Sequence, residues 1–136
     1  MLVELVIAMA VVALLTLIAV QSLARVADAA AVREEVSRVV GAIDVARSAA
    51  VRLDATAALA LLDTGYTVRA RVGTDTVDTW HDAGPAMRGV RLAGAGAPIE
   101  FGPAGIAIGA ANRTIVLTRG GARRAIVMSR LGRLTY

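Results

Sequence analysis

The sequence predicts an α+β protein in which one long N-terminal helix packs on an antiparallel β-sheet or β-sandwich head. Three observations predict this class. Residues 5–24 carry no charged side chain, residues 25–53 place apolar residues at helical spacing, and the remaining chain alternates strand-like runs with turns. A helix buries one stripe and a sheet one face, so the amphipathic part of the helix is expected to cover the sheet. The 136 residues suffice for one such head.

Residues 1–24 are expected to form the transmembrane half of the helix. Twenty uncharged residues separate Glu4 from Arg25, and at about 1.5 Å per residue they cross a bilayer core of about 30 Å. A secretory signal peptide is one alternative, since Ala27-Asp28-Ala29 resembles a cleavage site. Such peptides normally begin with positive charge, whereas the only early side-chain charge here is negative. A buried core helix is the other alternative, but a short chain hardly encloses an apolar helix on every side.

Residues 25–136 are expected to form the head, which begins with the amphipathic half of the same helix, continuing to about residue 53. Residues 25–53 contain no Pro and a single Gly, Gly41. Its apolar residues recur at spacings of three and four, as in an amphipathic helix. These residues are Ala29, Val32, Val36, Val39, Val40, Ile43, Ala46 and Ala50. The two halves together predict a rod of roughly fifty residues, about 75 Å long.

After residue 53 the pattern becomes that of short strands separated by turn residues. Strands are predicted over 66–72, 89–93, 99–101, 113–119 and 123–129, with a closing edge over 131–136. Gly120-Gly121 predicts a hairpin between the two runs that flank it. Residues 55–62 are ambiguous between a helix end and a first strand.

The charge distribution predicts a basic surface formed late in the chain. All fifteen basic residues are Arg. Residues 1–100 hold nine Arg and eleven acids, a net charge of −2, whereas the last thirty-six residues hold six Arg and no acid, a net charge of +6. Five of these arginines are candidate DNA-binding residues: Arg119, Arg123 and Arg124, expected at the hairpin tip, and then Arg130 and Arg133. The alternative is a merely solvated strand face.

Nothing in the sequence favours an enzyme. The chain has no Cys and a single His, His81, and no nucleophile–base set is apparent. His81 lacks partners at metal-ligand spacing. The Gly-rich segments 94–96 and 102–109 lack the Gly-Lys-Ser/Thr ending of phosphate loops. We therefore expect no metal, no cofactor and no small-molecule substrate. Aromatic residues make up only 3% of the chain, so any DNA binding would be directed at phosphates.

Four segments resemble one bacterial family. Leu2-Val3-Glu4-Leu5, leading into the apolar run, resembles the type IV prepilin motif, in which a leader ends in Gly and cleavage leaves Phe-Thr-Leu-(Ile or Val)-Glu-Leu. Here Met1 stands at the Thr position. Residues 44–52 resemble the helix end of the GspH/FimT minor pseudopilins. Residues 99–105 resemble the F-x-P-x-G turn of that family, and the segment formed by 114–117 and 125–133 resembles its closing hairpin. Residues 56–97 show no such resemblance.

The resemblance implies a single-pass bacterial inner-membrane protein with a periplasmic head. Such a subunit contacts membrane lipid first and then other pilins or pseudopilins, in the tip of a type IV pilus or of a type II secretion pseudopilus. It also implies a prepilin peptidase acting on a longer precursor, with N-terminal methylation. Arg25 directly after the apolar run would favour the wrong orientation by the positive-inside rule. A basic leader would correct this, so we expect the gene product to begin upstream of Met1.

Glu4 is the candidate assembly residue. A carboxylate beside lipid is costly and points to a partner, which in the family is the free amine of a neighbouring subunit's first residue. Alternatively, Glu4 lies at headgroup level and favours the helix N-terminus.

Three functions stay open at this point: an assembly subunit, a filament-tip protein that captures DNA, and a simple membrane-anchored periplasmic domain. FimT-like DNA binders use a Gly-Arg-x-Arg stretch, of which Gly132-Arg133-Leu134-Thr135 keeps the first Arg only. The sequence does not separate a pilus from a secretion system.

Overall fold

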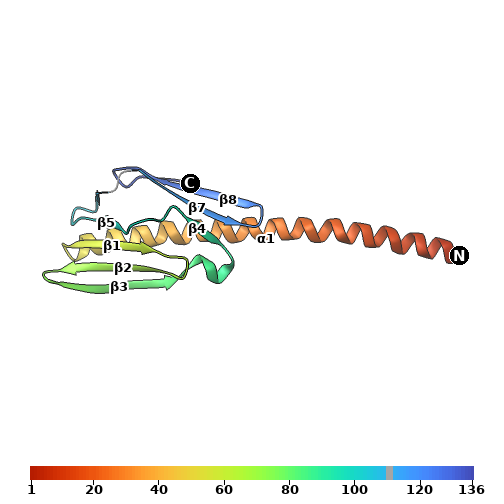
Figure 1. The fold of residues 1–136 in the computed structure, drawn as a ribbon, viewed down its shortest axis with the longest axis horizontal. Helices are drawn as coiled ribbons and strands as arrows, with labels where there is room; N and C mark the ends of the chain where they lie inside the picture. The colour runs from red at the N-terminus through yellow and green to blue at the C-terminus, as the bar shows by residue number, and fades with distance from the viewer. Residues whose placement is uncertain (110–111) are drawn as a thin grey trace.

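The N-terminal part of the chain is one continuous helix, α1, which spans Leu2–Arg52. The computed structural model describes residues 1–109 and 112–136. Figure 1 shows α1 leaving the head as a rod whose N-terminal end stands clear of every strand. The helix stops because Asp54 takes a φ of 46° and the amide of Ala55 bonds back to the Ala50 carbonyl at 3.1 Å. The long N-terminal helix of the predicted fold class is confirmed.

In the described part of the chain, two antiparallel sheets form the head. The first contains β1 (Thr56–Leu61), β2 (Gly65–Val72), β3 (Asp75–Ala83), β5 (Ile99–Phe101) and β6 (Ala107–Ile108), in the order β3-β2-β1-β5-β6. The second contains β4 (Arg91–Ala93), β7 (Arg113–Arg119), β8 (Ala122–Met128) and β9 (Leu134–Thr135), in the order β4-β7-β8-β9. A 3₁₀ turn, η1 (Pro85–Arg88), leads from β3 towards β4. The α+β class is confirmed.

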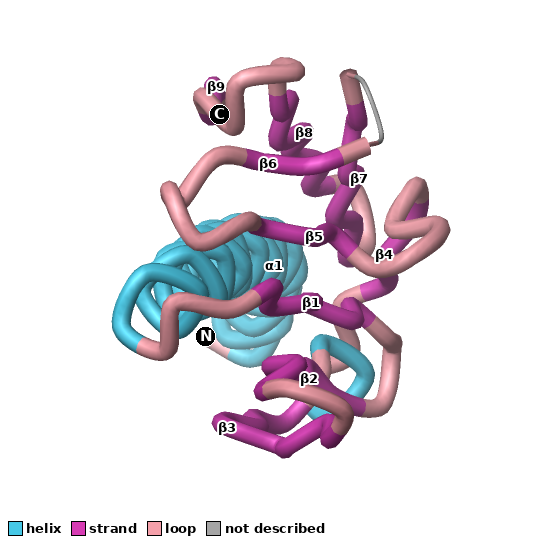
Figure 2. Tube along the Cα trace, turned by 90° about the vertical axis from the view of Figure 1, so that its left-hand side faces the viewer, coloured by secondary structure: helices cyan, strands magenta, loops and turns pink. Residues whose placement is uncertain are grey.

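Both sheets lie to one side of α1, which they cover along its second half (Figure 2). Burial of α1 begins at Val32 and follows the predicted apolar stripe. Alternate residues of β1 and β2 point into this core, as period two requires. The largest apolar side chains of the core are Ile43, Leu59, Tyr66, Phe101, Ile115, Leu117, Ile126 and Met128. The buried side chains of α1 are mainly those of Val and Ala, and these small side chains allow the sheets to pack close to the helix.

Most strands lie where alternation predicts them. The exceptions are β3 and the two-residue β6 (Ala107–Ile108), which were not predicted, and the strand expected over 89–93. Residues 55–62, ambiguous in sequence, contain β1. β3 was not predicted, because it is an edge strand whose residues are almost all exposed and therefore show no apolar alternation. The strand expected over 89–93 starts only at Arg91, because Gly89, at a φ of 67°, ends η1.

Candidate functional site

Glu4 lies in the first turn of α1, at the end of the rod farthest from the strands (Figure 1). Its side chain is exposed and borders a shallow depression with Met1, Leu5 and Ala8. The next charged residue along the helix is Arg25. The head lies too far from Glu4 to supply a partner for its carboxylate.

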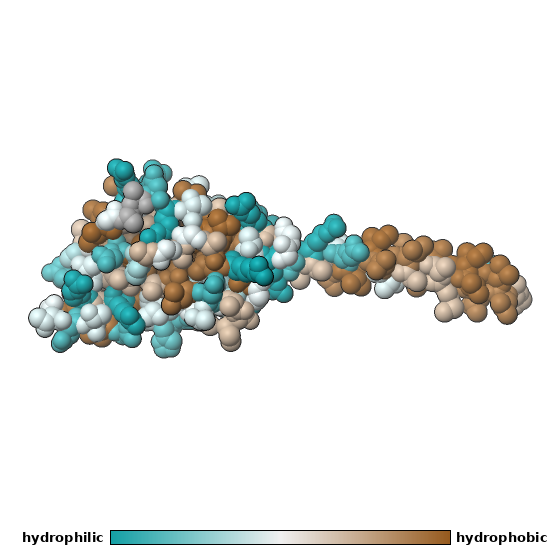
Figure 3. All heavy atoms as spheres, viewed as in Figure 1, coloured by the Kyte–Doolittle hydropathy of each residue, from teal (hydrophilic) through white to brown (hydrophobic). Residues whose placement is uncertain are grey.

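The segment between Glu4 and Arg25 exposes apolar side chains all around the helix. Every residue from Met1 to Ala27 is exposed. Among the described residues, α1 is the one helix long and apolar enough to cross a membrane. Figure 3 shows this segment as an apolar rod projecting from a head whose surface mixes hydrophilic and hydrophobic residues. Such a surface is stable against lipid or against other apolar helices.

The tip of the β7–β8 hairpin meets α1 just beyond the apolar segment. The Nε atom of Arg119 lies 3.0 Å from Oδ1 of Asp28, and its Nη1 donates a hydrogen bond of 2.8 Å to the Arg88 carbonyl. Gly120 has a φ of 52°, and a Cβ at this position would collide with the Asp28 carboxylate. The positive φ favours glycine here, and a larger residue would displace the Asp28 carboxylate that pairs with Arg119. Arg119, a candidate DNA-binding residue, is thus engaged within the molecule.

Arg123 and Arg124 lie near the same tip. Strand register places Arg123 opposite Thr118 and Arg124 opposite Leu117, and both arginine side chains are exposed. Arg124 borders a groove between β8 and α1 that Arg33 also lines. Both candidates therefore belong to the end of the head from which the apolar helix leaves.

Arg130 and Arg133 lie at the opposite end of β8. The turn between them is closed by the amide of Ser129, which donates to the carbonyl of Arg133 at 2.9 Å. Both side chains are exposed and line a shallow depression together with Asn112 and Thr135. The structure therefore divides the five candidate arginines between two ends of the head.

A buried polar cluster, which the sequence did not predict, ties α1 to η1 and β2. Glu35 is fully buried. Its Oε1 accepts a 2.7 Å hydrogen bond from the Tyr66 hydroxyl, and its Oε2 lies 3.5 Å from Nε of Arg88. Burial, reinforced by the bond to Glu35, raises the pKa of Tyr66 far above its usual range. The sequence does contain a signal for the burial of Glu35: this residue falls on the same helix face as the apolar residues Val32 and Val39.

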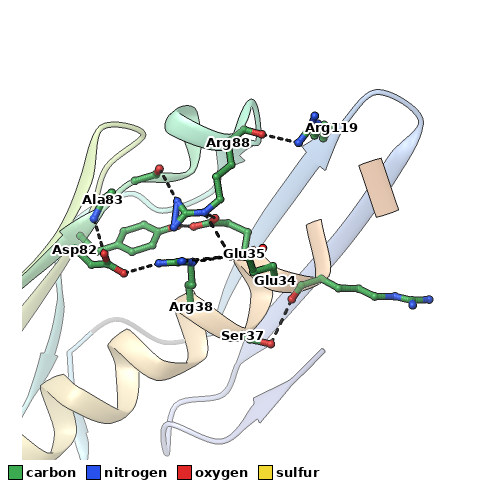
Figure 4. Close-up of polar contacts among 11 residues, drawn as sticks. Glu34, Glu35, Ser37, Arg38, Asp82, Ala83, Arg88 and Arg119 are labelled. Carbon is green, nitrogen blue, oxygen red and sulfur yellow. Dashed lines mark hydrogen bonds and ion pairs between the residues drawn. The ribbon is translucent and has the colours of Figure 1, made fainter. Parts of the chain in front are cut away.

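A second layer of charges surrounds this cluster. Arg38 lies 3.0 Å from Asp82 and 3.2 Å from Glu34, and Glu34 in turn lies 3.7 Å from Arg88. Figure 4 shows Arg88 reaching from η1 towards Glu35, with the Arg38–Asp82 pair alongside. Because Arg119 bonds the Arg88 carbonyl, the cluster connects α1 with both sheets.

Arg47 forms another junction, nearer the C-terminal end of α1. Its Nη2 donates a 2.8 Å hydrogen bond to the Gly132 carbonyl, and its guanidinium carbon lies 5.5 Å from the centre of the Phe101 ring. A Cβ at Gly105 would lie 3.3 Å from Cγ of Arg47. One side chain therefore holds the β5–β6 turn and the turn after β8 against the helix.

Residues 1–109 and 112–136 contain no cluster of three or more His, Cys, Asp or Glu side chains that could hold a metal ion. His81 lies on the exposed edge strand β3.

A family model described as Type II transport protein GspH matches residues 35–132, which is most of the chain. The chain belongs to the GspH family. The range matched by the GspH model begins at Glu35 and includes Arg47 and both turns that Arg47 contacts. It does not include Glu4 or the apolar segment.

Two solved structures have a fold similar to that of this GspH-family chain. It is similar to the type IV minor pilin FimU of Pseudomonas aeruginosa PAO1 in two crystal forms. The P21 form has a TM-score of 0.63 and 16% identity, over 76% of this chain and 86% of FimU. The P65 form has a TM-score of 0.54 and 17% identity, over 78% and 89% respectively. At this identity the likeness concerns the fold alone. No curated protein sequence matches the chain.

Proposed function

We propose that this GspH-family chain is a minor pilin or pseudopilin. It acts as a structural and assembly subunit at the tip of a type II secretion pseudopilus or a type IV pilus. The observation that supports this most directly is the bare apolar segment, residues 5–24, projecting from a head that covers only the second half of α1. No enzymatic step is part of the proposal.

The apolar segment gives the subunit two successive environments. Before assembly it crosses the inner membrane once, with the head in the periplasm and lipid around residues 5–24. In the filament, the apolar helices of other pilins or pseudopilins replace the lipid, so the segment stays out of water throughout. Processing and methylation by a prepilin peptidase belong to the same proposal, because Leu2-Val3-Glu4-Leu5 resembles that enzyme's motif.

Glu4 sets the register between neighbouring subunits in this proposal. Its carboxylate pairs with the N-terminal amine of the adjacent subunit, in apolar surroundings where opposite charges interact much more strongly than in water. An unpaired carboxylate in that position is costly. One axial offset of the helices therefore becomes strongly preferred over the others.

Glu4→Ala is expected to lower incorporation of the subunit into sheared filaments by more than about tenfold, because the neighbour's amine loses its partner. Immunoblots of sheared and membrane fractions measure this. The membrane level of the subunit should stay unchanged, since Glu4 makes no contact with the head. Glu100→Ala, which removes an exposed carboxylate from β5, is the matched control and should assemble normally. Normal assembly of Glu4→Ala would refute the pairing role.

A second candidate function, DNA capture, is favoured by the turn after β8. Arg130 and Arg133 are exposed, take part in no ion pair among the described residues, and flank one depression. A duplex would be held there through its phosphates, without base readout. Non-specific binding of this kind has a Kd of about 10⁻⁴–10⁻⁶ M at physiological salt.

Fluorescence anisotropy of the full chain in detergent with random duplex DNA tests this second function. Affinity is expected to fall with rising salt, at a logarithmic slope of about −0.9 for each phosphate neutralised. Arg130→Ala with Arg133→Ala should reduce that slope by roughly two. Arg123→Ala with Arg124→Ala removes the same charge from the other end of the head and should leave the slope unchanged. Equal effects of the two pairs, or no binding at low salt, would exclude this site.

A further inference from the structure

Five arginines gather at the end of the head from which the apolar helix leaves. They come from α1, β4 and β8, and we call them the basic collar: Arg25, Arg33, Arg91, Arg123 and Arg124. Arg91 borders a small depression with Arg119 and Gly120, at the hairpin tip. Arg124 and Arg33 line one groove. The collar therefore joins residues that are nearly one hundred positions apart in the sequence.

The depth of the collar follows from the contact between Gly120 and Asp28. Asp28 lies four residues beyond Ala24, the last residue of the uncharged segment, which is about 6 Å along the helix axis. The headgroup layer of a bilayer is about 5–7 Å thick on each side of the apolar core. When residues 5–24 cross a membrane, the hairpin tip therefore lies at headgroup level. Figure 1 shows the tip of the β7–β8 hairpin at this end of the head.

The positive charge of the collar is not neutralised within the described residues. All five side chains are exposed and none takes part in an ion pair there. The nearby carboxylates are occupied by other arginines: Asp28 by Arg119, Glu34 by Arg38 and Glu35 by Arg88. Figure 3 shows hydrophilic atoms at the border between the head and the apolar rod.

An exposed apolar residue lies at the same end. Met87, in η1, is 78% exposed. The next residue, Arg88, reaches Glu35 of α1 and bonds Arg119 through its carbonyl, which places η1 beside the collar. Basic side chains next to an exposed apolar one are typical of surfaces that lie in a membrane interface.

We propose that the basic collar is a docking surface for the headgroups of anionic phospholipids. This rests on the proposed function, since it requires residues 5–24 to lie in a bilayer. Guanidinium groups bind phosphate oxygens through paired hydrogen bonds. The contact holds the head against the membrane before assembly. It is released when the apolar segment leaves the bilayer for the filament. Lipid is favoured over DNA at this site because the collar faces the membrane.

A single label at the hairpin tip tests the proposal in the full chain. The protein has no Cys, so Gly121→Cys gives a unique attachment site, and the Cβ that the substitution adds has no atom within 4 Å outside residues 120–122. The fluorophore-labelled chain is placed in nanodiscs of phosphatidylcholine, alone or mixed with phosphatidylglycerol, each containing a headgroup-linked quencher. We expect stronger quenching in the anionic nanodiscs, and loss of the difference in high salt.

Two triple variants identify the residues responsible. Replacing Arg91, Arg123 and Arg124 by Ser should lower the equilibrium constant for contact with the anionic surface by about a hundredfold, roughly fivefold for each arginine. The matched control replaces Arg71, Arg130 and Arg133 by Ser. It removes the same charge from positions distant from the collar and should leave quenching unchanged.

The outcomes separate this proposal from the proposed function. Equal quenching in neutral and anionic nanodiscs, or an equal loss in both triple variants, would overturn the basic collar and leave the assembly role intact. A chain that does not enter nanodiscs of either composition would overturn both, since residues 5–24 would then not be a membrane segment.

Discussion

Arg88→Ala is expected to lower the free energy of unfolding of the head by about 3–5 kcal/mol, the usual effect of removing one partner from a buried ion pair. The Glu35 carboxylate is fully buried, and Nε of Arg88, 3.5 Å away, is the positive group next to its Oε2. The loss is measured by denaturant titration of the full chain in detergent. Fluorescence of Trp80, the single Trp, reports on the head.

Arg91→Ala is the matched control, three residues further along the chain. Arg91 is exposed and pairs with no carboxylate among the described residues, so its loss should change the free energy of unfolding by less than about 0.5 kcal/mol. Similar small losses in both variants would show that Arg88 does not compensate the buried charge.

A second pair of variants separates charge compensation from packing. Replacing Glu35 by Leu and Arg88 by Met removes both charges at similar volume, which is often neutral or stabilising for buried ion pairs. The double variant should therefore be more stable than Arg88→Ala. Its Tyr66 hydroxyl then lacks an acceptor, at a cost of about 1–3 kcal/mol, which Tyr66→Phe should recover.

The fold was predictable because its main signals are local. An uncharged run, followed by apolar residues that recur every three or four positions, predicts α1. Alternation of polar and apolar residues predicts β2 and β7. β3 escaped prediction because an edge strand exposed on both faces has no alternation to detect. Residues 55–62 were ambiguous because their many alanines suit a helix end as well as the strand that Leu59 and Leu61 anchor in the core.

The candidate site was less predictable, because it depends on contacts between distant segments. The sequence places Arg119 close to Arg123 and Arg124. It does not show that the hairpin tip at Gly120 meets α1, where Arg119 pairs with Asp28. Glu35 could have been found as an acid on an apolar helix face. Its partners, Tyr66 and Arg88, lie on β2 and η1, and no sequence spacing connects them.

Arg47 brings together three of the stretches in which the sequence resembles the family. Residues 44–52, 99–105 and 125–133 are far apart in sequence, but each supplies part of the junction around this side chain. Gly132, at a φ of 77°, is buried, and a Cβ there would lie 3.0 Å from Nη2 of Arg47. The positive φ favours glycine at this turn, and a Cβ would also push against the guanidinium.

Arg47→Ala is expected to lower the free energy of unfolding of the head by about 2–3 kcal/mol. It removes a hydrogen bond from a charged donor to the Gly132 carbonyl, the contact with the Phe101 ring and the packing of the aliphatic stem against Gly105. Arg47→Lys keeps the charge but not the planar group, so it should recover only part of the loss. Arg52→Ala, in the exposed last turn of α1, should cost less than about 1 kcal/mol. Hydrogen exchange adds a local measurement, since the amide of Gly132 should lose protection in Arg47→Ala and keep it in Arg52→Ala. Equal stability of these two variants would show that Arg47 does not hold the turns to the helix.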